Sequence, residues 1–353
     1  MKPGMTQTQL LDKLQYIQDN RQDKIVPSNK MVYVKGDVYY NEGHKCILTD
    51  HAHIQLASYL GIPLSAMRQF CKDESLYPHW DSIVNTKIEQ KGEDKNRLLR
   101  ITNCKCEGMV STRFNVGYDA HLTFPTLLEA VKPLGLHLDS GSITDTYSYM
   151  KLLSPKTKGT ILGQEVQFGL CHSNSDFGLA RHRTDLLIFI LSCLNGMVVS
   201  SVACTVSRTH RGREMWINED GETDGLPDPI KIREEIEALA ASTNDMLNSN
   251  RIDKITEHIE EIGKRHIGGE SKKIEKYLKS LGLGFEINGI VRHYNQAADY
   301  SVWGLSNAIT RTAQDVGSYD TSVAMEKAGW SIFNNPPAEY IPSVQLVVEG
   351  MLN

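Results

Sequence analysis

The spacing of hydrophobic residues changes near residue 217, and this change limits the possible folds more than any other feature of the chain. Between Arg97 and Arg208, segments alternate in polarity or are rich in β-branched and aromatic residues, which indicates β-strands. From Pro229 onward, isoleucine and leucine recur every three or four residues, as in segment 252–262, which is typical of amphipathic helices. We therefore expect an α+β protein in which a central, largely antiparallel sheet carries packed helices.

The same change predicts the domain organisation. We expect residues 1–217 to form an α+β main domain, residues 218–283 an inserted, all-helical acidic arm, and residues 284–353 helices that return to the main domain. Proline and glycine at the ends of the arm favour a unit that projects from the sheet. The helices expected from hydrophobic spacing cover residues 7–18, 125–131, 230–247, 252–262, 271–281, 294–314 and 318–330.

The longest apolar run, LLIFILSCL at residues 186–194, lies between Asp185 and Asn195. A transmembrane helix needs about 20 apolar residues, so this run is too short to cross a bilayer. We interpret it as a buried helix that ends at Asn195 and Gly196, a typical helix-terminating pair, before one long strand over residues 196–210. No membrane association is expected.

The N-terminus and the cysteines indicate the cellular compartment. The sequence MKPGMTQTQLLDK lacks the apolar stretch and cleavage site of a secretory signal. Seven cysteines are irregularly spaced in a chain of 353 residues, which is long enough to bury a full core. We therefore expect a cytoplasmic protein with free thiols and without disulfides.

Charge is unevenly distributed along the chain. The formal net charge is −5, which argues against a protein that coats nucleic acid with its whole surface. However, segment 156–213 contains seven basic and three acidic residues, whereas segment 219–261 contains four basic and thirteen acidic ones. The middle of the chain is therefore the place to look for an anion-binding surface.

Two expected strands bring basic residues together. Arg181 and Arg183 flank His182 and should project from one face, and a further basic group lies where the next strand leaves the sheet. If both strands share a sheet, these guanidinium groups form one surface suited to phosphate oxygens. Solvated charges, or ion pairs with the acidic arm, are the equally open alternative. The candidate nucleic-acid-binding residues are Arg113, Arg181, Arg183, Arg208, His210, Arg211 and Arg213.

Motifs for nucleotide or metal chemistry are missing from the sequence. It contains no G-x-x-x-x-G-K-[ST], no G-x-G-x-x-G after a strand and no H-E-x-x-H, so no cofactor is expected. His44, Cys46, His51 and His53 resemble a ligand set, but the last two fall at i and i+2 of an expected helix and face apart. Cys104-x-Cys106 is a single pair and is better explained by a hairpin. We assign no metal site and no catalytic residue.

Cys193 and Trp303 each allow a functional and a structural interpretation. The neighbours of Cys193 are apolar, and burial raises the pKa of a thiol, so a packed core thiol is favoured over a nucleophile. Trp303 shares a helix face with Asn307 and Arg311 and would suit base stacking. A tryptophan on an amphipathic helix packs more often in the core, which is the favoured interpretation.

Several stretches resemble a phage- and plasmid-borne family, number 932 among the domains of unknown function. They are LTDHAHIQLASYLGIPLSAM (48–67), VSTRFNVGYDAHLTFPTLLEAV (110–131), LIFILSCLNGMV (187–198), SRTHRG (207–212) and VWGLSNAIT (302–310). The chain departs from the family pattern at Phe114, where a tyrosine is expected, which puts a role for a phenol hydroxyl there in doubt. The resemblance implies DNA metabolism, since such genes lie beside replication and recombination genes of mobile elements, and it extends distantly to RecT/Erf single-strand annealing proteins.

These features favour a non-enzymatic protein of a phage or plasmid that binds single-stranded DNA in recombination or annealing without ATP. We expect a homo-oligomer in the cytoplasm of a bacterial host cell. The alternative is an inhibitor or adaptor that binds a host defence or replication protein through the acidic segment 219–261. An enzyme such as a nuclease ranks last, because no carboxylate cluster is recognisable.

Overall fold

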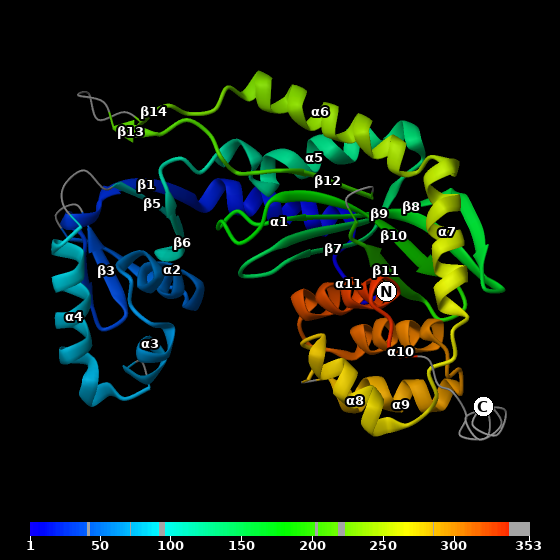
Figure 1. Ribbon diagram of the computed structural model, residues 1–353. Coiled ribbons are helices and arrows are strands. Elements are labelled where there is room, and N and C mark those ends of the chain that lie inside the picture. The colour runs from blue at the N-terminus through cyan, green and yellow to red at the C-terminus, as the bar shows by residue number, and fades with distance from the viewer. Residues whose placement is uncertain are drawn as a thin grey trace, which may run out of the picture.

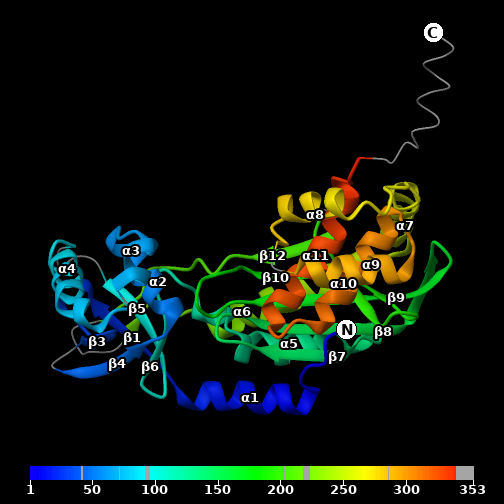
Figure 2. The same ribbon diagram turned by 90° about the horizontal axis from the view of Figure 1, so that it is seen from below.

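The computed structural model describes residues 1–40, 43–70, 72–91, 96–201, 204–217, 223–284 and 286–338. Within them the protein has the expected α+β fold, with two six-stranded sheets and helices on both sides (Figure 1). The two sheets lie side by side rather than face to face (Figure 2). No helix in the described part of the chain is long and apolar enough to cross a membrane.

Residues 21–111 form the N-terminal lobe, which has a hydrophobic core of its own around Tyr33, Trp80 and Leu99. Its strands run in the order β1-β5-β6-β4-β3-β2, antiparallel except for β4 beside β6. The bounds are β1 Arg21–Pro27, β2 Val32–Val34, β3 Asp37–Tyr40, β4 His44–Leu48, β5 Asn96–Thr102, β6 Lys105–Ser111, α2 Asp50–Leu60, α3 Leu64–Phe70 and α4 Tyr77–Glu89, with short 3-10 turns at Ser28–Lys30 and Glu74–Leu76.

The central sheet is antiparallel throughout and has the order β11-β10-β9-β8-β7, with β12 beside the first half of β10. Two helices, α1 and α5, pack against one of its faces. The bounds are α1 Gln7–Asn20, α5 Ala120–Val131, β7 His137–Ile143, β8 Ser148–Ile161, β9 Gln164–Asn174, β10 His182–Ile190, β11 Asn195–Val199 and β12 Thr205–Arg208, with 3-10 turns at Val116–Tyr118 (η3) and Lys132–Leu134.

The prediction of a buried helix at residues 186–194 is wrong, because residues 186–190 of this run continue strand β10. Its even-numbered residues Leu186 and Ile188 join the core under α1 and α5, and Leu187 packs with α11 (Tyr319–Asn334) on the opposite face. A strand buried on both faces is continuously apolar, so its pattern resembles that of a buried helix. The chain then turns at Leu194, in left-handed conformation with φ of 55°, and Asn195 begins β11. The long strand expected after it is likewise two strands, β11 and β12.

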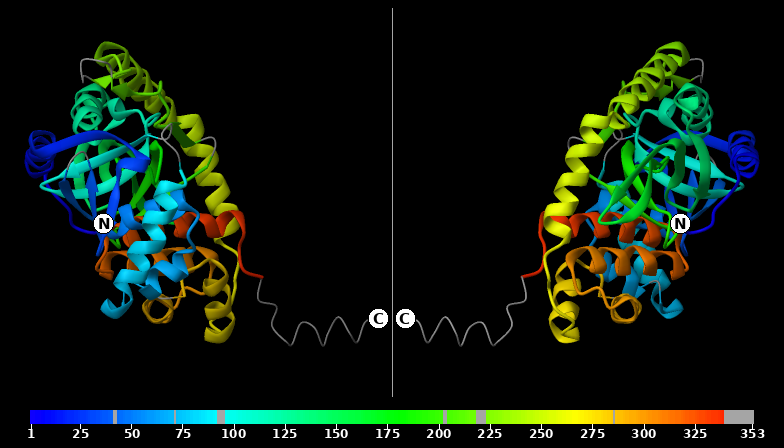
Figure 3. Two further views of the ribbon diagram at one scale, coloured as in Figure 1. Left: turned by 90° about the vertical axis from the view of Figure 1, so that its left-hand side faces the viewer. Right: turned by 90° about the vertical axis from the view of Figure 1, so that its right-hand side faces the viewer.

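The remaining helices enclose the central sheet rather than project from it. α6 packs on α5 and α7 reaches α10 and α11, so that the band from α6 to α8 runs down one side of the molecule (Figure 3). Their buried residues belong to the same core cluster as the central sheet. The bounds are α6 Pro229–Met246, α7 Ser249–Gly263, α8 Ser271–Ser280, α9 Ile287–Ala297 and α10 Val302–Asp315, with a short strand pair β13 Trp216–Ile217 and β14 Thr223–Asp224.

The two largest hydrophobic clusters of the described residues both include residues from 1–217, and residues 229–283 share the larger of the two. The single helix expected over 294–314 is divided between α9 and α10, because Ala298 adopts a left-handed conformation. The expected helix over 318–330 corresponds to α11 and that over 7–18 to α1.

Candidate nucleic-acid interface

Two adjoining cavities lie where the N-terminal lobe meets the central sheet. The α6 cavity, of about 510 Å³, is bounded by η3, the segment 211–215 and the start of α6. The α2 cavity, of about 680 Å³, is bounded by α2, the end of β6 and Gly178–Leu179. Phe114 and Arg211 line both, so the two cavities adjoin at these residues, and we call the pair the junction groove.

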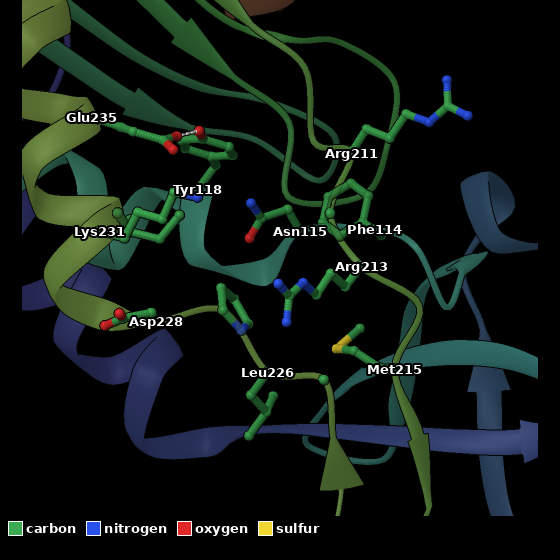
Figure 4. A pocket seen from close by; sticks show the side chains of 14 residues that line it. Phe114, Asn115, Tyr118, Arg211, Arg213, Met215, Leu226, Asp228, Lys231 and Glu235 are labelled. Atoms are coloured by element: carbon green, nitrogen blue, oxygen red, sulfur yellow. Dashed lines mark hydrogen bonds between the residues drawn. The ribbon is translucent and has the colours of Figure 1, made fainter.

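The α6 cavity has a guanidinium group at its centre. Figure 4 shows Arg213 pointing into it beside Asn115, whereas Arg211 points away. Both acidic groups of the wall accept hydrogen bonds from neutral donors: Asp228 accepts from the Ile230 amide at 2.9 Å and caps α6, and Glu235 accepts from the hydroxyl of Tyr118. Neither Arg211 nor Arg213 has a carboxylate partner within the described residues, so both remain available to an anion.

The α2 cavity contains three arginines and, among its described lining residues, no carboxylate. Arg97 donates to the Met109 carbonyl at 2.9 Å and stacks over the Tyr59 ring at 4.4 Å. Arg113 pairs with Glu214 at 3.4 Å, but both side chains are more than half exposed, so the pair is weak. The cavity therefore offers positive charge next to an aromatic face.

His210 supports the floor of the groove. Its ring stacks on Phe114 at a centroid distance of 4.6 Å, and its Nε2 lies 2.6 Å from the Asn174 side-chain oxygen. Asn174 in turn donates to the Tyr118 carbonyl at 2.7 Å. Burial lowers the pKa of His210 to about 4, so the ring is neutral at physiological pH and acts as a packed support rather than as a cation.

A buried ionic network fixes the two lobes relative to each other below this floor. Arg100, on β5 and fully buried, donates twice to Asp119 at the start of α5 and once to the Asp176 carbonyl at 2.8 Å. Arg21, at the start of β1, donates to the Asp176 carboxylate at 2.8 Å. Burial raises the pKa of Asp176, but Arg21 and Arg100 outweigh it and lower that pKa. The network ties the N-terminal lobe to the loops that line the groove.

Asp119, His121 and Asp176 offer ligand atoms within 4.8 Å of one another, a spacing that suits a metal ion. The two carboxylates already bind the guanidinium groups of Arg21 and Arg100. Burial raises the pKa of Asp119 to about 7 even though Arg100 lowers it. We interpret this cluster as a structural ionic network.

The predicted basic residues do not form one surface. His210, Arg113, Arg211 and Arg213 lie at the junction groove. Arg208 pairs in register with His182, and side chains alternate along a strand, so Arg208 and Arg183 lie on opposite faces of the central sheet. The expectation of a shared surface is therefore wrong for them.

The groups outside the groove have different surroundings. Arg208 is exposed and bonds only to the Ser207 carbonyl, at 3.2 Å, among the partners found in the described chain. Arg183 is bound to Asp185, with Nε 2.8 and 2.9 Å from its oxygens. Arg181 is exposed and precedes β10, because residues 177–181 form a loop rather than the expected strand.

Sequence reasoning missed Arg97, Tyr59 and Lys231, which the fold brings to the groove from β5, α2 and α6. Arg97 opens an expected strand and Lys231 lies in the acidic segment, so neither belongs to a local basic cluster. Only the proximity of these three elements identifies them.

The other candidates have structural surroundings. His51 lies with Nε2 3.2 Å from the Phe177 carbonyl oxygen, and His53 with Nε2 3.0 Å from the Tyr33 hydroxyl. Cys104 lies in the β5–β6 hairpin turn, and Trp303 is buried in the core with 3% exposure, as predicted. Cys193 is half-buried in the turn before β11, so its assignment to a buried helix was wrong.

The chain matches no protein-family model, and no curated protein or solved structure matches it.

Proposed function

We propose that the protein binds a single nucleic-acid strand along the junction groove, with phosphates on Arg113, Arg211 and Arg213. The observation that carries this proposal is the position of Arg211 and Arg213 at two adjoining cavities, without a carboxylate partner among the described residues. A guanidinium group matches the geometry of phosphate oxygens, and neutralising the backbone supplies most of the affinity for nucleic acid.

The size and walls of the groove favour a single strand over a duplex. Cavities of about 510 and 680 Å³ fall in the range that accepts ligands as large as individual nucleotides. Aromatic and apolar side chains such as Tyr59, Phe114 and Leu179 stand beside the cations, and bases that are not paired can stack on such surfaces. A supporting floor of neutral, hydrogen-bonded groups reduces the cost of ordering the site on binding.

A protein-binding role is the second candidate. A third cavity of about 300 Å³ between α5 and α6 has mainly apolar walls. Beside it, Leu122, Leu226 and Ile230 are 43, 61 and 71% exposed, which is unusual for large apolar side chains in one place. This face, on the acidic helix α6, suits an inhibitor or adaptor.

The deciding experiment is fluorescence anisotropy with single- and double-stranded oligonucleotides at several salt concentrations. We expect Arg211→Ala with Arg213→Ala to weaken single-strand binding and to flatten the log–log salt dependence by about 0.7 per lost phosphate contact. The control is Lys272→Ala with Lys276→Ala, which removes the same charge from exposed positions on α8.

Equal losses in both double variants would point to a general effect of charge and count against the groove. Binding of neither strand type by the wild-type protein at low salt would contradict the proposal and favour the protein-binding role. Mixing complementary strands with the protein in the absence of ATP tests annealing. Light scattering of the protein measures its oligomeric state.

A further inference from the structure

A further cavity, the α11 cavity, lies on the other side of loop 175–181 from the junction groove. It measures about 520 Å³ and is bounded by the start of β8, the residues before β10 and the first half of α11. Arg181, Arg183 and Lys327 line it, together with one acidic residue, Asp320. Arg181 and Arg183 are thus two of the three predicted basic residues that the junction groove lacks.

The charges of the α11 cavity are held in place and are incompletely neutralised. Asp185 is fully buried and lies 2.8 Å from the guanidinium of Arg183 and 3.5 Å from Nζ of Lys327, so one carboxylate serves two cations. Asp320 accepts from the hydroxyls of Thr144 and Thr146, each at 3.0 Å.

Arg181 has no carboxylate partner in the described part of the chain. The cavity therefore keeps positive charge that an anion can neutralise.

Two aromatic rings, Tyr147 and Tyr149, line the α11 cavity and begin a row that continues to the buried Tyr319. Tyr147 stacks on Tyr149 at 5.7 Å, and Tyr149 lies 5.5 Å from Tyr319 of α11. Tyr147 is only half-buried, so one end of this row reaches the cavity surface. Aromatic faces beside cations are the combination that binds single-stranded nucleic acid without sequence preference.

The α2 and α11 cavities meet across two consecutive residues. Leu179 lines the first cavity and Ala180 the second. The loop between them is fixed: Ser175 donates to the Thr146 carbonyl at 2.8 Å and accepts from the Leu179 amide at 3.2 Å. Gly178 has φ of 79° and lies against Val110, a conformation and a space that other residues do not tolerate well. A strand that crosses this loop passes directly from one cavity to the other.

We propose that the α11 cavity is a second phosphate-binding subsite for the same nucleic-acid strand, with Arg181 as its main contact. This inference rests on the proposed function of the junction groove. The strand then runs from the α6 cavity past Arg211 into the α2 cavity, and over Leu179 to Arg181. The protein covers more nucleotides than the junction groove alone can hold.

The test compares binding of oligothymidylates of about 4 and about 12 nucleotides, a short and a long length within the range of common single-strand footprints. We expect Arg181→Glu to weaken binding of the longer strand about tenfold, because it replaces a phosphate contact by a repulsion. Binding of the shorter strand, which the junction groove alone can hold, should change by less than about twofold. Arg208→Glu is the matched control, since Arg208 is exposed, carries the same charge and lines neither cavity.

The outcomes separate this inference from the proposed function. If the wild-type protein binds neither length, the proposed function fails and the second subsite with it. If the wild-type protein binds both and Arg181→Glu leaves both affinities unchanged, the α11 cavity is not a subsite although the groove stands. Equal weakening at both lengths, matched by Arg208→Glu, would be general electrostatic repulsion and would also overturn the subsite.

Discussion

At the residue scale, three histidines lie at or below the floor of the junction groove, of which His172 and His182 are buried and His210 is half-buried. The ring centroids of His172 and His182 are 4.3 Å apart, and Tyr118 stacks on His182 at 5.9 Å and lies edge-on to His210 at 5.8 Å. Burial lowers the pKa of each, to about 3 for His172 and to about 4 for His210. The folded state therefore favours the neutral form of these rings.

Folding stability should consequently decrease as the pH falls. An unfolded histidine binds a proton below about 6.5, whereas folded His172 does so only near 3, so its contribution is complete above 6.5 and declines between these values. At pH 5, the shifted pKa of His172 alone lowers the free energy of unfolding by about 2 kcal/mol. Urea titrations at pH 7.5 and 5 measure the difference.

The variant His172→Gln, which retains a hydrogen-bonding group near Thr184 (2.8 Å in the wild type), should reduce the pH dependence by this amount. His44→Gln on the exposed side of β4 is the control and should leave the dependence unchanged. An equal dependence in the wild type and His172→Gln would show that this ring does not control it.

At the scale of elements, the run 186–194 shows how a strand replaces a helix. Five consecutive apolar residues, 186–190, form the second half of β10. Because the strand is covered on both faces, each of these side chains packs against other apolar groups in the extended chain. A helix of the same residues would also bury them, and only the neighbouring strands β9 and β11 select the extended form. Cys193 then falls in a turn, not in the core.

This position makes a clear prediction for two cysteines. Cys193→Ser should change the free energy of unfolding by less than about 1 kcal/mol, because the half-buried turn leaves its hydroxyl access to water. Cys171→Ser should cost about 1–3 kcal/mol, because Cys171 is buried in the cluster with Leu187 and Val323 and the new hydroxyl would lose hydrogen bonds to water. Denaturant titration measures both, and a larger loss for Cys193 would contradict the turn assignment.

At the scale of the whole molecule, helices α6 to α8 are part of the central core. Their buried side chains, including Ile236, Met246, Ile259 and Leu278, join the cluster of the central sheet. Each contributes about 1.5–3 kcal/mol by burial, so these four alone contribute about 6–12 kcal/mol, which is comparable with the net stability of about 5–15 kcal/mol typical of a protein. The acidic segment therefore supports the fold in addition to any role in binding.

Deletion of residues 219–283, bridged by a short glycine-serine linker, should accordingly abolish cooperative unfolding and expose apolar surface. Near-ultraviolet circular dichroism and binding of a hydrophobic dye measure this loss. As a control, Glu234→Gln with Glu237→Gln lowers the negative charge of α6 at exposed positions and should leave the fold intact. A cooperative thermal transition in the deletion variant would mean that the helices are dispensable.

The sequence by itself determined those features that depend on local pattern. The α+β class, the amphipathic helices after Pro229 and the hairpin at Cys104 follow from periodicity, and the burial of Trp303 follows from its place on a helix face. Clustering along the chain also made Arg211 and Arg213 candidate binding residues, and the fold keeps them together because they lie on one short segment.

Only the tertiary structure decided which distant elements meet. The division into two cores, the strand at 186–190 and the packing of α6 to α8 depend on contacts between residues far apart in the chain. The same holds for Arg97 and Lys231, which join the groove from separate elements. Arg183 and Arg208 were separated by strand register, since a pairing of His182 with Arg208 sends their neighbours to the opposite face. Hydrophobic periodicity shows which side chains of a segment are buried, but it does not show which distant segment packs against them.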